Sequence, residues 1–273
     1  MVEILVHFVA PALVGVLIGV ASGLLGIGGG TVMVPIFRLA FGMSATMSTA
    51  TSLFAIIPTS ISGAISHAKG KTCIPALGIA AGLGGACMSP IGVWLAQLSP
   101  DWLVMLAAAL IIGYSAINMF KKAFKLRPAG QPAAGVDAVA PTADDSSLSR
   151  KQLLQGAAIG LVAGLASGYV GVGGGFIMVP LMLSIIGIPM RKASGTSLIA
   201  VMILAIPGVI EQGIIGNINY LAGIAIVIGT IPGAVIGARL VTKVPERTLR
   251  LLFGCFLIVA AVMLVLNEVG IFG

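Results

Sequence analysis

Residues 21–35 read ASGLLGIGGGTVMVP, and residues 166–180, which lie 145 positions further along the chain, read ASGYVGVGGGFIMVP. The likeness extends to both sides, because residues 15–53 and 160–198 are identical at 16 of 39 positions without a gap. A Thr-Ser-Leu triplet follows each copy at the same distance. We call residues 21–35 the first motif and residues 166–180 the second motif. A doubled motif of this kind indicates a chain built from two related halves.

The composition indicates whether this chain folds in water or in a lipid bilayer. Its mean hydropathy is +1.15, 58% of its residues are apolar and only 8% are charged, whereas a soluble domain carries roughly a quarter charged residues. Apolar runs long enough to span a bilayer recur along the chain. These runs do not alternate with a period of two, so they are typical of helices and not of barrel strands. We therefore expect an all-α polytopic membrane protein.

Each half is expected to contain five helical segments. The predicted ranges are 7–27, 30–42, 46–67, 73–97 and 102–120 in the first half, and 152–172, 175–187, 191–210, 219–241 and 247–267 in the second. These divide the chain into a first repeat (1–120), a cytoplasmic, disordered linker (121–151) and a second repeat (152–273). The second segment of each half is too short to cross a bilayer comfortably and carries a proline, so we expect it to be short or re-entrant. The total is then eight to ten segments.

The positive-inside rule favours halves of opposite orientation. If each half crosses five times, or three times with a re-entrant hairpin, 14 of the 15 basic residues lie on the cytoplasmic side and Arg38 is the exception. If each half crosses four times, the distribution is 8 against 7. We therefore predict inverted repeats with both termini outside.

Charge and cysteine content exclude several classes of protein. The net charge is +7, but the basic residues lie at the ends of hydrophobic runs, as membrane anchors do, so no nucleic-acid partner is expected. Cys73, Cys87 and Cys255 lack metal-ligand spacing and are interpreted as small buried apolar residues. Neither a metal nor a cofactor is expected, and no catalytic constellation can be assembled, so the sequence does not indicate an enzyme.

The glycine runs have the chemistry of an anion site. A helix that begins at such a run presents unpaired backbone N–H groups and the positive end of its dipole. Glycine lets a ligand approach the backbone and permits a positive φ. In an inverted-repeat fold, two such helix starts meet near the bilayer midplane. The candidate substrate-binding residues are Gly28, Gly29, Gly30 and Thr31, with Gly173, Gly174, Gly175 and Phe176 in the second half.

Hydroxyl groups could complete this site. The candidates are Thr51, Ser52, Thr196 and Ser197. Their alternative role is hydrogen bonding to the carbonyl four residues earlier in the helix. Ser22 and Ser167 could either contact a ligand or serve as small packing residues. His67 and Glu211 lie at segment ends and are interpreted as residues at the mouths of the pathway.

The motifs resemble those of the sulfite exporter TauE/SafE family of bacterial membrane permeases. The resemblance rests on SGLLGIGGGTVMVP, SGYVGVGGGFIMVP and the ATSL and GTSL that follow them, and it covers the chain except the linker. It implies a multi-pass protein of the bacterial inner membrane that transports small sulfur-containing anions such as sulfite, sulfoacetate or thiosulfate. Half one departs from the pattern, with Ala50 where half two has Gly195.

Export of such an anion from a negative-inside cell needs no coupling ion, because the potential supplies roughly 2.3 kcal/mol per charge per 100 mV. The sequence leaves three alternatives open: an importer, a channel for another small anion, and a membrane assembly factor that transports nothing. The expected partners are the small anionic substrate and the lipid bilayer, and a homo-oligomer remains open.

Overall fold

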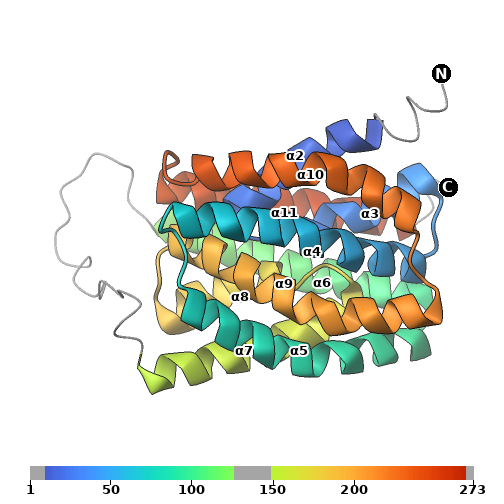
Figure 1. Ribbon diagram of the computed structural model, residues 1–273, viewed down its shortest axis with the longest axis horizontal. Helices are drawn as coiled ribbons and strands as arrows, with labels where there is room; N and C mark the ends of the chain where they lie inside the picture. The colour runs from blue at the N-terminus through green and yellow to red at the C-terminus, as the bar shows by residue number, and fades with distance from the viewer. Residues whose placement is uncertain (1–9, 126–148, 269–273) are drawn as a thin grey trace.

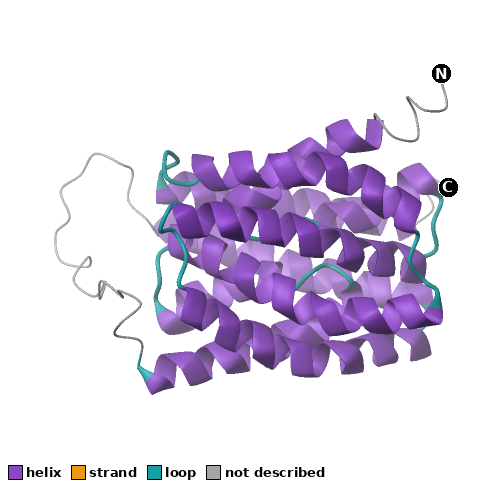
Figure 2. Ribbon diagram, in the orientation of Figure 1, coloured by secondary structure: helices purple, strands orange, loops and turns teal. Residues whose placement is uncertain are grey.

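The computed structural model describes residues 10–125 and 149–268, which are helical apart from short loops (Figures 1 and 2). The first half contains α2 (Ala10–Leu25), α3 (Gly30–Phe41), α4 (Ala45–Lys69), α5 (Pro75–Leu98) and α6 (Asp101–Lys125). The second contains α7 (Arg150–Val170), α8 (Gly175–Leu181), which continues as the π-helix η2 (Met182–Ile186), α9 (Met190–Ile215), α10 (Tyr220–Leu240) and α11 (Glu246–Glu268). Seven of the described helices are long and apolar enough to cross a bilayer. The chain is thus an all-α polytopic membrane protein, and each half has the five segments expected.

The two halves interlock by reciprocal contacts. The first helix of each half packs against the fourth helix of the other, α2 on α10 and α7 on α5. The third helices, α4 and α9, pack on each other, and so do the fifth, α6 and α11. Because the main contacts between the halves have counterparts with the halves exchanged, the halves are related by a pseudo-twofold axis, as in an isologous dimer.

The halves run in opposite directions. Figure 1 shows that α6 ends and α7 begins at one end of the bundle, which we call the linker end, whereas α2 begins and α11 ends at the opposite end. Each short segment turns back to the end from which its half started, so α2–α3 forms a re-entrant hairpin that opens opposite to the α7–η2 hairpin. Lys122, near the end of α6, hydrogen-bonds Ser184 of η2, which agrees with this placement. The predicted inverted repeats are therefore present.

Equivalent caps confirm how the halves correspond. The Asp101 carboxylate at the start of α6 accepts a hydrogen bond from the backbone N–H of Ala45 at the start of α4 (3.3 Å). In the second half, Glu246 at the start of α11 accepts one from the N–H of Met190 at the start of α9 (3.3 Å). A carboxylate at a helix N-terminus satisfies a free donor and favours the positive end of the dipole. Each half thus fixes its third helix with an acid from its fifth.

Glycines allow the helices of opposite halves to touch backbone to backbone. A methyl group added at Gly160 of α7 would lie 1.9 Å from the carbonyl oxygen of Ala81 in α5, and one at Gly229 of α10 would lie 1.8 Å from that of Ala12 in α2. Such contacts are impossible for any larger residue. The small-residue spacing read in the sequence is therefore a helix-packing device at these positions, as is common in membranes.

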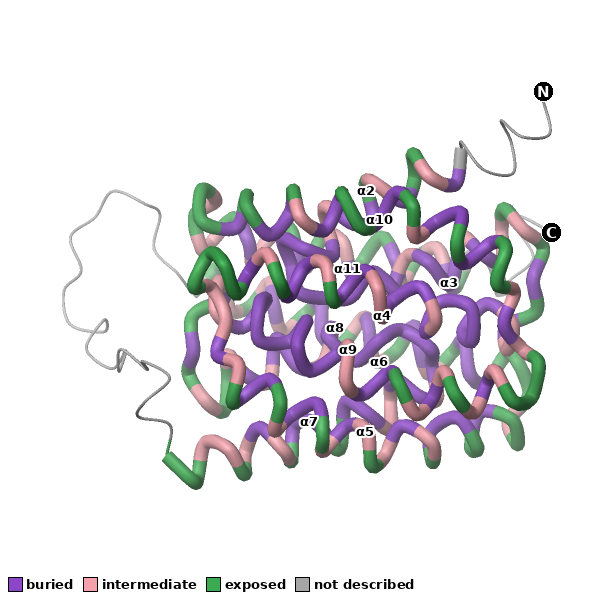
Figure 3. The backbone as a smooth tube through the Cα atoms, viewed as in Figure 1, coloured by how far each residue is buried: buried purple, intermediate pink, exposed green. Residues whose placement is uncertain are grey.

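The outer surface of the bundle is apolar, as lipid contact requires. Figure 3 shows buried residues on the inner faces of the helices and exposed residues on the outer ones. The exposed side chains include Leu17, Leu110 and Ile214, which are 73%, 65% and 82% exposed. Two cysteines lie on this surface, because Cys87 and Cys255 are exposed and Cys73 is half-buried. The expectation that all three are buried was wrong.

Basic residues gather at the linker end. Of the 14 described Lys and Arg residues, 13 lie in or near helix ends and loops at that end, and Arg38 of α3 is the exception. The 13 residues are Lys69, Lys71, Lys121, Lys122, Lys125, Arg150, Lys151, Arg191, Lys192, Arg239, Lys243, Arg247 and Arg250. By the positive-inside rule, this asymmetry favours a cytoplasmic linker end. Most of the linker itself, residues 126–148, lies outside the described residues, as do residues 1–9 and 269–273.

Candidate functional site

Both motifs break their hairpins with glycines in left-handed conformations. The first break spans residues 26–29, and its Gly28 and Gly29 have φ values of 80° and 87°. The second break spans residues 171–174, and its Gly173 and Gly174 have φ values of 87° and 68°. Side chains other than glycine rarely adopt such angles. The glycine runs are therefore needed to turn the chain inside the bundle, where α3 and α8 begin.

The two breaks meet in the interior of the protein. A methyl group added at Gly30 would lie 2.5 Å from the carbonyl oxygen of Val172, and one added at Gly175 would lie 2.5 Å from that of Gly26. Gly28 and Gly173 both face Ile56 of α4. The backbones of the two motifs, which are more than 140 positions apart in sequence, are thus in contact. This juxtaposition is what the duplicated motif predicted for an inverted-repeat fold.

We call the place where the two breaks meet the glycine crossing. The helices that begin there have backbone N–H groups without acceptors. Within the described chain, the N–H groups of Gly29, Gly30 and Thr31 have no hydrogen-bond acceptor, and the N–H groups of Gly174 and Phe176 have none either. The N–H of Gly175 is used, because it donates to the carbonyl oxygen of Gly173 (2.8 Å). Both α3 and the 12-residue segment Gly175–Ile186 begin at the breaks and run outward toward opposite ends of the bundle. The N-termini of both segments, which are the positive ends of their dipoles, therefore lie in the same central region.

Unpartnered hydroxyls surround the same crossing. Ser22, Ser60 and Ser167 are fully buried, and their hydroxyls have no hydrogen-bond partner among the described residues. A methyl group at Gly28 would lie 3.4 Å from the Ser60 Oγ, and methyl groups at Gly29 and Gly174 would lie 3.6 Å and 3.4 Å from the Cβ atoms of Ser22 and Ser167. A buried hydroxyl without a partner costs about 1–3 kcal/mol. A ligand that accepts these hydrogen bonds would remove that cost.

Only some of the hydroxyls chosen from the sequence remain available to a ligand. The Ser52 and Thr31 hydroxyls are buried and unpartnered. Thr51 Oγ1 instead accepts from the N–H of Asn219 (3.0 Å), and Thr196 Oγ1 accepts from the N–H of Ile74 (2.9 Å) and donates to the carbonyl of Lys192. These threonines cap the fourth helix of the opposite half. Back-bonding, the alternative considered for them, is therefore observed at Thr196.

Ser197 belongs to the first break. Its hydroxyl is within hydrogen-bond distance of the carbonyl oxygens of Gly26 (2.7 Å) and Ser194 (2.9 Å). It therefore holds the first break against α9. Ser60 was missed by sequence reasoning because it lies outside the aligned motifs and half two has Ala205 at the equivalent position. Only its burial and its lack of a partner identify it.

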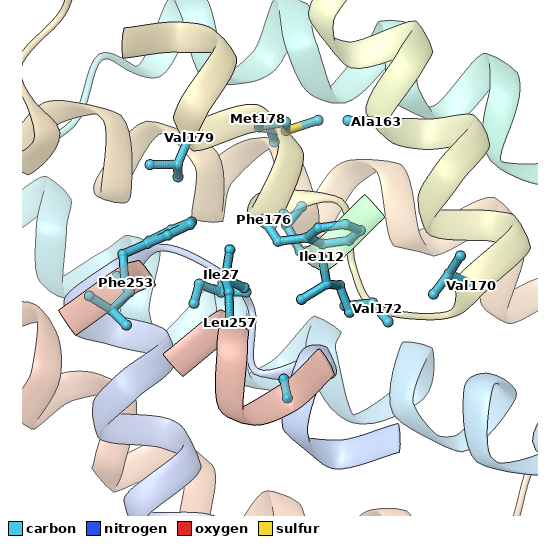
Figure 4. Close-up of a cluster of buried hydrophobic side chains, with 14 of the residues drawn as sticks. Ile27, Ile112, Ala163, Val170, Val172, Phe176, Met178, Val179, Phe253 and Leu257 are labelled. Atoms are coloured by element: carbon cyan, nitrogen blue, oxygen red, sulfur yellow. The ribbon is translucent and has the colours of Figure 1, made fainter. Parts of the chain in front are cut away.

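Phe176 contributes its backbone and not its ring. Its side chain is fully buried in the hydrophobic cluster of Figure 4, beside Ile27, Ile112 and Val172. The ring therefore fills the space between the two motifs, α6 and α8. Its equivalent in half one is Thr31. The two helix starts thus carry different side chains at this position, a hydroxyl at Thr31 and an aromatic ring at Phe176.

His67 is not at a mouth of the pathway. It is fully buried, its Nε2 donates to the carbonyl oxygen of Gly23 (2.7 Å), and its Nδ1 pairs with the Thr72 hydroxyl (2.7 Å). Gly23 lies in the last turn of α2 (Ala10–Leu25), just before the first break. His67 therefore ties the first hairpin to α4, and the interpretation of His67 as a mouth residue was wrong.

Comparison with known proteins assigns the chain to a family. The model of the sulfite exporter TauE/SafE family matches residues 11–264, so the chain belongs to that family. It is 28% identical to the probable membrane transporter protein YunE of Bacillus subtilis (strain 168), covering 97% of this chain and 99% of that protein. A probable membrane transporter protein of Haemophilus influenzae is 29% identical, covering 93% and 97% of the two chains. No solved structure matches. The chain is a multi-pass protein of a membrane transporter family.

Proposed function

We propose that this protein is a permease that exports small sulfur-containing anions, such as sulfite, sulfoacetate or thiosulfate, across the bacterial inner membrane. The observation that carries the proposal is the meeting of the two glycine breaks, where N–H groups without a described acceptor and buried serines without a described partner lie at or beside the breaks. The description of the family supports the substrate class.

The proposed site suits an oxyanion because it offers donors without a fixed positive charge. Several neutral N–H and O–H groups replace the hydration of an anion, and two helix dipoles add to the attraction. A weakly held anion can also leave, which transport requires. The proposed site has no formal charge of its own. After the anion is released, the empty site therefore needs no counterion while the transporter returns to its starting conformation.

The two hairpins supply the moving parts in this proposal. One opens toward the linker end and the other toward the opposite end. In inverted-repeat transporters, rocking of one repeat against the other opens the central site to each side in turn. Here Ile56 lies against both Gly28 and Gly173, so a shift of α4 would change access to both breaks. The membrane potential would drive export of the anion at roughly 2.3 kcal/mol per charge per 100 mV.

The test is flux from proteoliposomes loaded with sulfite or sulfoacetate, with and without a potassium-diffusion potential. We expect saturable efflux that accelerates when the interior is negative. Efflux that is independent of potential but follows a proton gradient would contradict uncoupled export. Transport of carboxylates with no transport of either sulfur compound would contradict the substrate class, and the absence of all flux would favour an assembly factor.

A further inference from the structure

A groove on the outside of the second hairpin is separate from the glycine crossing. It is a cavity of about 820 Å³ between α6, α7 and the α8–η2 segment. Its walls include Tyr114 and Val162, which are 69% and 57% exposed on the outer surface of the bundle. The groove is therefore open to the surface that faces lipid.

The α6 wall of this groove changes from apolar to polar along its length. Ala107 and Ile111 lie at one end, Ser115 and Asn118 follow, and Lys122 lies at the linker end. The 16 residues from Ala107 to Lys122 extend about 22 Å, since each of the steps between them rises about 1.5 Å. One leaflet has about 15 Å of hydrocarbon and, beyond it, the head group. The groove thus has the length and polarity gradient of one lipid molecule in a single leaflet.

Lys122 provides a positive charge that no carboxylate of residues 10–125 and 149–268 pairs with. Its ammonium group donates to the carbonyl oxygen of Pro180 (2.9 Å) and to the Ser184 hydroxyl, which are both uncharged acceptors. No carboxylate pairs with Lys122 in the part of the chain that the structure describes. Arg250 of α11 is near enough for its positive charge to act on Lys122. An ammonium group has three donors, so one remains for an incoming anion.

We propose that this groove binds one anionic phospholipid from the leaflet at the linker end, with its acyl chain along α6 and α7 and its phosphate at Lys122. The positive charge of Lys122 favours an anionic head group, and the apolar walls of the groove favour an acyl chain. Because Lys122 also holds the Pro180 carbonyl of the second motif, the bound lipid contacts the base of the second hairpin directly.

The experiment measures lipid retained by the full-length protein. Wild type and variants are purified from phosphatidylethanolamine and phosphatidylglycerol mixtures, and bound lipids are counted by native mass spectrometry. Titration with phosphatidylglycerol or phosphatidylcholine gives the affinities. We expect Lys122→Gln to weaken phosphatidylglycerol binding about fivefold, since one basic residue near an anionic surface contributes about 1 kcal/mol. Its affinity for phosphatidylcholine should not change.

Two further variants make the result specific. Lys121→Gln removes the same charge from the neighbouring exposed position, which does not line the groove, and should retain wild-type binding. Ala166→Trp fills the groove from α7 and should expel the lipid whatever its head group. Glycerol phosphate, the head group without chains, should not compete.

Three results would overturn the proposal. Equal retention of phosphatidylglycerol in all variants would show that the groove holds no specific lipid. Displacement by glycerol phosphate would make Lys122 part of a site for free anions. Loss of a dimer in Ala166→Trp, with lipid retention unchanged, would make the groove an interface between copies of the chain.

Discussion

At the scale of single residues, the buried hydroxyls are of two kinds: those that form hydrogen bonds within the described structure and those that form none there. The Thr196 hydroxyl is hydrogen-bonded to the N–H of Ile74 and the carbonyl of Lys192, whereas the hydroxyls of Ser22 and Ser167 have no partner in the part of the chain that the structure describes. The sequence places Thr196 and Ser197 in the same duplicated triplet as Thr51 and Ser52. It could not distinguish their roles, because Ile74 lies 122 residues from Thr196 and Gly26 lies 171 residues from Ser197.

Replacing Thr196 by Val should destabilise the protein. Valine keeps the shape but leaves the buried N–H of Ile74 without an acceptor, which costs about 1–3 kcal/mol. The measurement is thermal unfolding of the purified protein in detergent, where we expect a lower midpoint. Thr196→Ser, which keeps the hydroxyl, serves as the control and should melt close to wild type. A Thr196→Val protein with wild-type melting and impaired transport would instead make Thr196 a ligand residue.

At the scale of the elements, glycine has two different uses. In the breaks it provides positive φ angles, and along α2, α5, α7 and α10 it removes side chains where helices of opposite halves cross. The helix ranges could be predicted closely, for example 73–97 for α5 and 247–267 for α11 against the observed Pro75–Leu98 and Glu246–Glu268. Apolar runs and their Gly and Pro boundaries are local signals.

The π-helical turn η2 could not be predicted. Pro180 lacks an N–H, and the Ser184 hydroxyl and the Lys122 ammonium group both donate to the Pro180 carbonyl (2.5 and 2.9 Å). This turn thus includes a contact from α6 that comes from 58 residues away in the sequence. Such π-helical turns are often found at functional sites, and this one lies at the end of the proposed lipid groove.

The crossing of α5 and α7 gives a prediction at this scale. Gly160→Ala places a methyl group 1.9 Å from the Ala81 carbonyl oxygen, so the helices must separate. We expect a loss of about 1–3 kcal/mol, as for other overpacked sites, seen as a lower unfolding midpoint. Gly113→Ala on α6 is the matched control, because nothing lies within 4 Å of the added methyl group. The packing interpretation fails if both variants melt alike.

At the scale of the whole molecule, the inverted arrangement fixes which loops share a side of the membrane. Lys71 and Lys243 lie at the linker end, and exposed Gln97 lies at the opposite end. In a background without the native cysteines, an impermeant maleimide should label Gln97→Cys in intact cells. Lys71→Cys and Lys243→Cys should react only after permeabilisation. Labelling of Lys243→Cys in intact cells, with Lys71→Cys protected, would mean parallel halves.

The doubled motif made the inverted architecture and the central crossing predictable, because a repeat with a short re-entrant segment has few ways to satisfy its backbone in lipid. Other features have no duplicate in the sequence. Ser60, the buried link from His67 to Gly23 and the groove at Lys122 each involve a residue whose equivalent in the second half is of another type, since the equivalent positions hold Ala205, Gln212 and Asn267. The pseudo-symmetry therefore predicts the scaffold but not the features that differ between the halves.

The most direct test of the central claim is sulfite efflux by the double variant Ser22→Ala, Ser167→Ala, measured together with its thermal unfolding. Both hydroxyls are buried without a partner, so their removal should leave the unfolding midpoint unchanged or higher. If they bind the anion beside Gly29 and Gly174, the KM for sulfite should rise by about thirtyfold, as expected for two lost hydrogen bonds of roughly 1 kcal/mol each. A double variant with wild-type stability and wild-type KM would contradict an anion site at the glycine crossing.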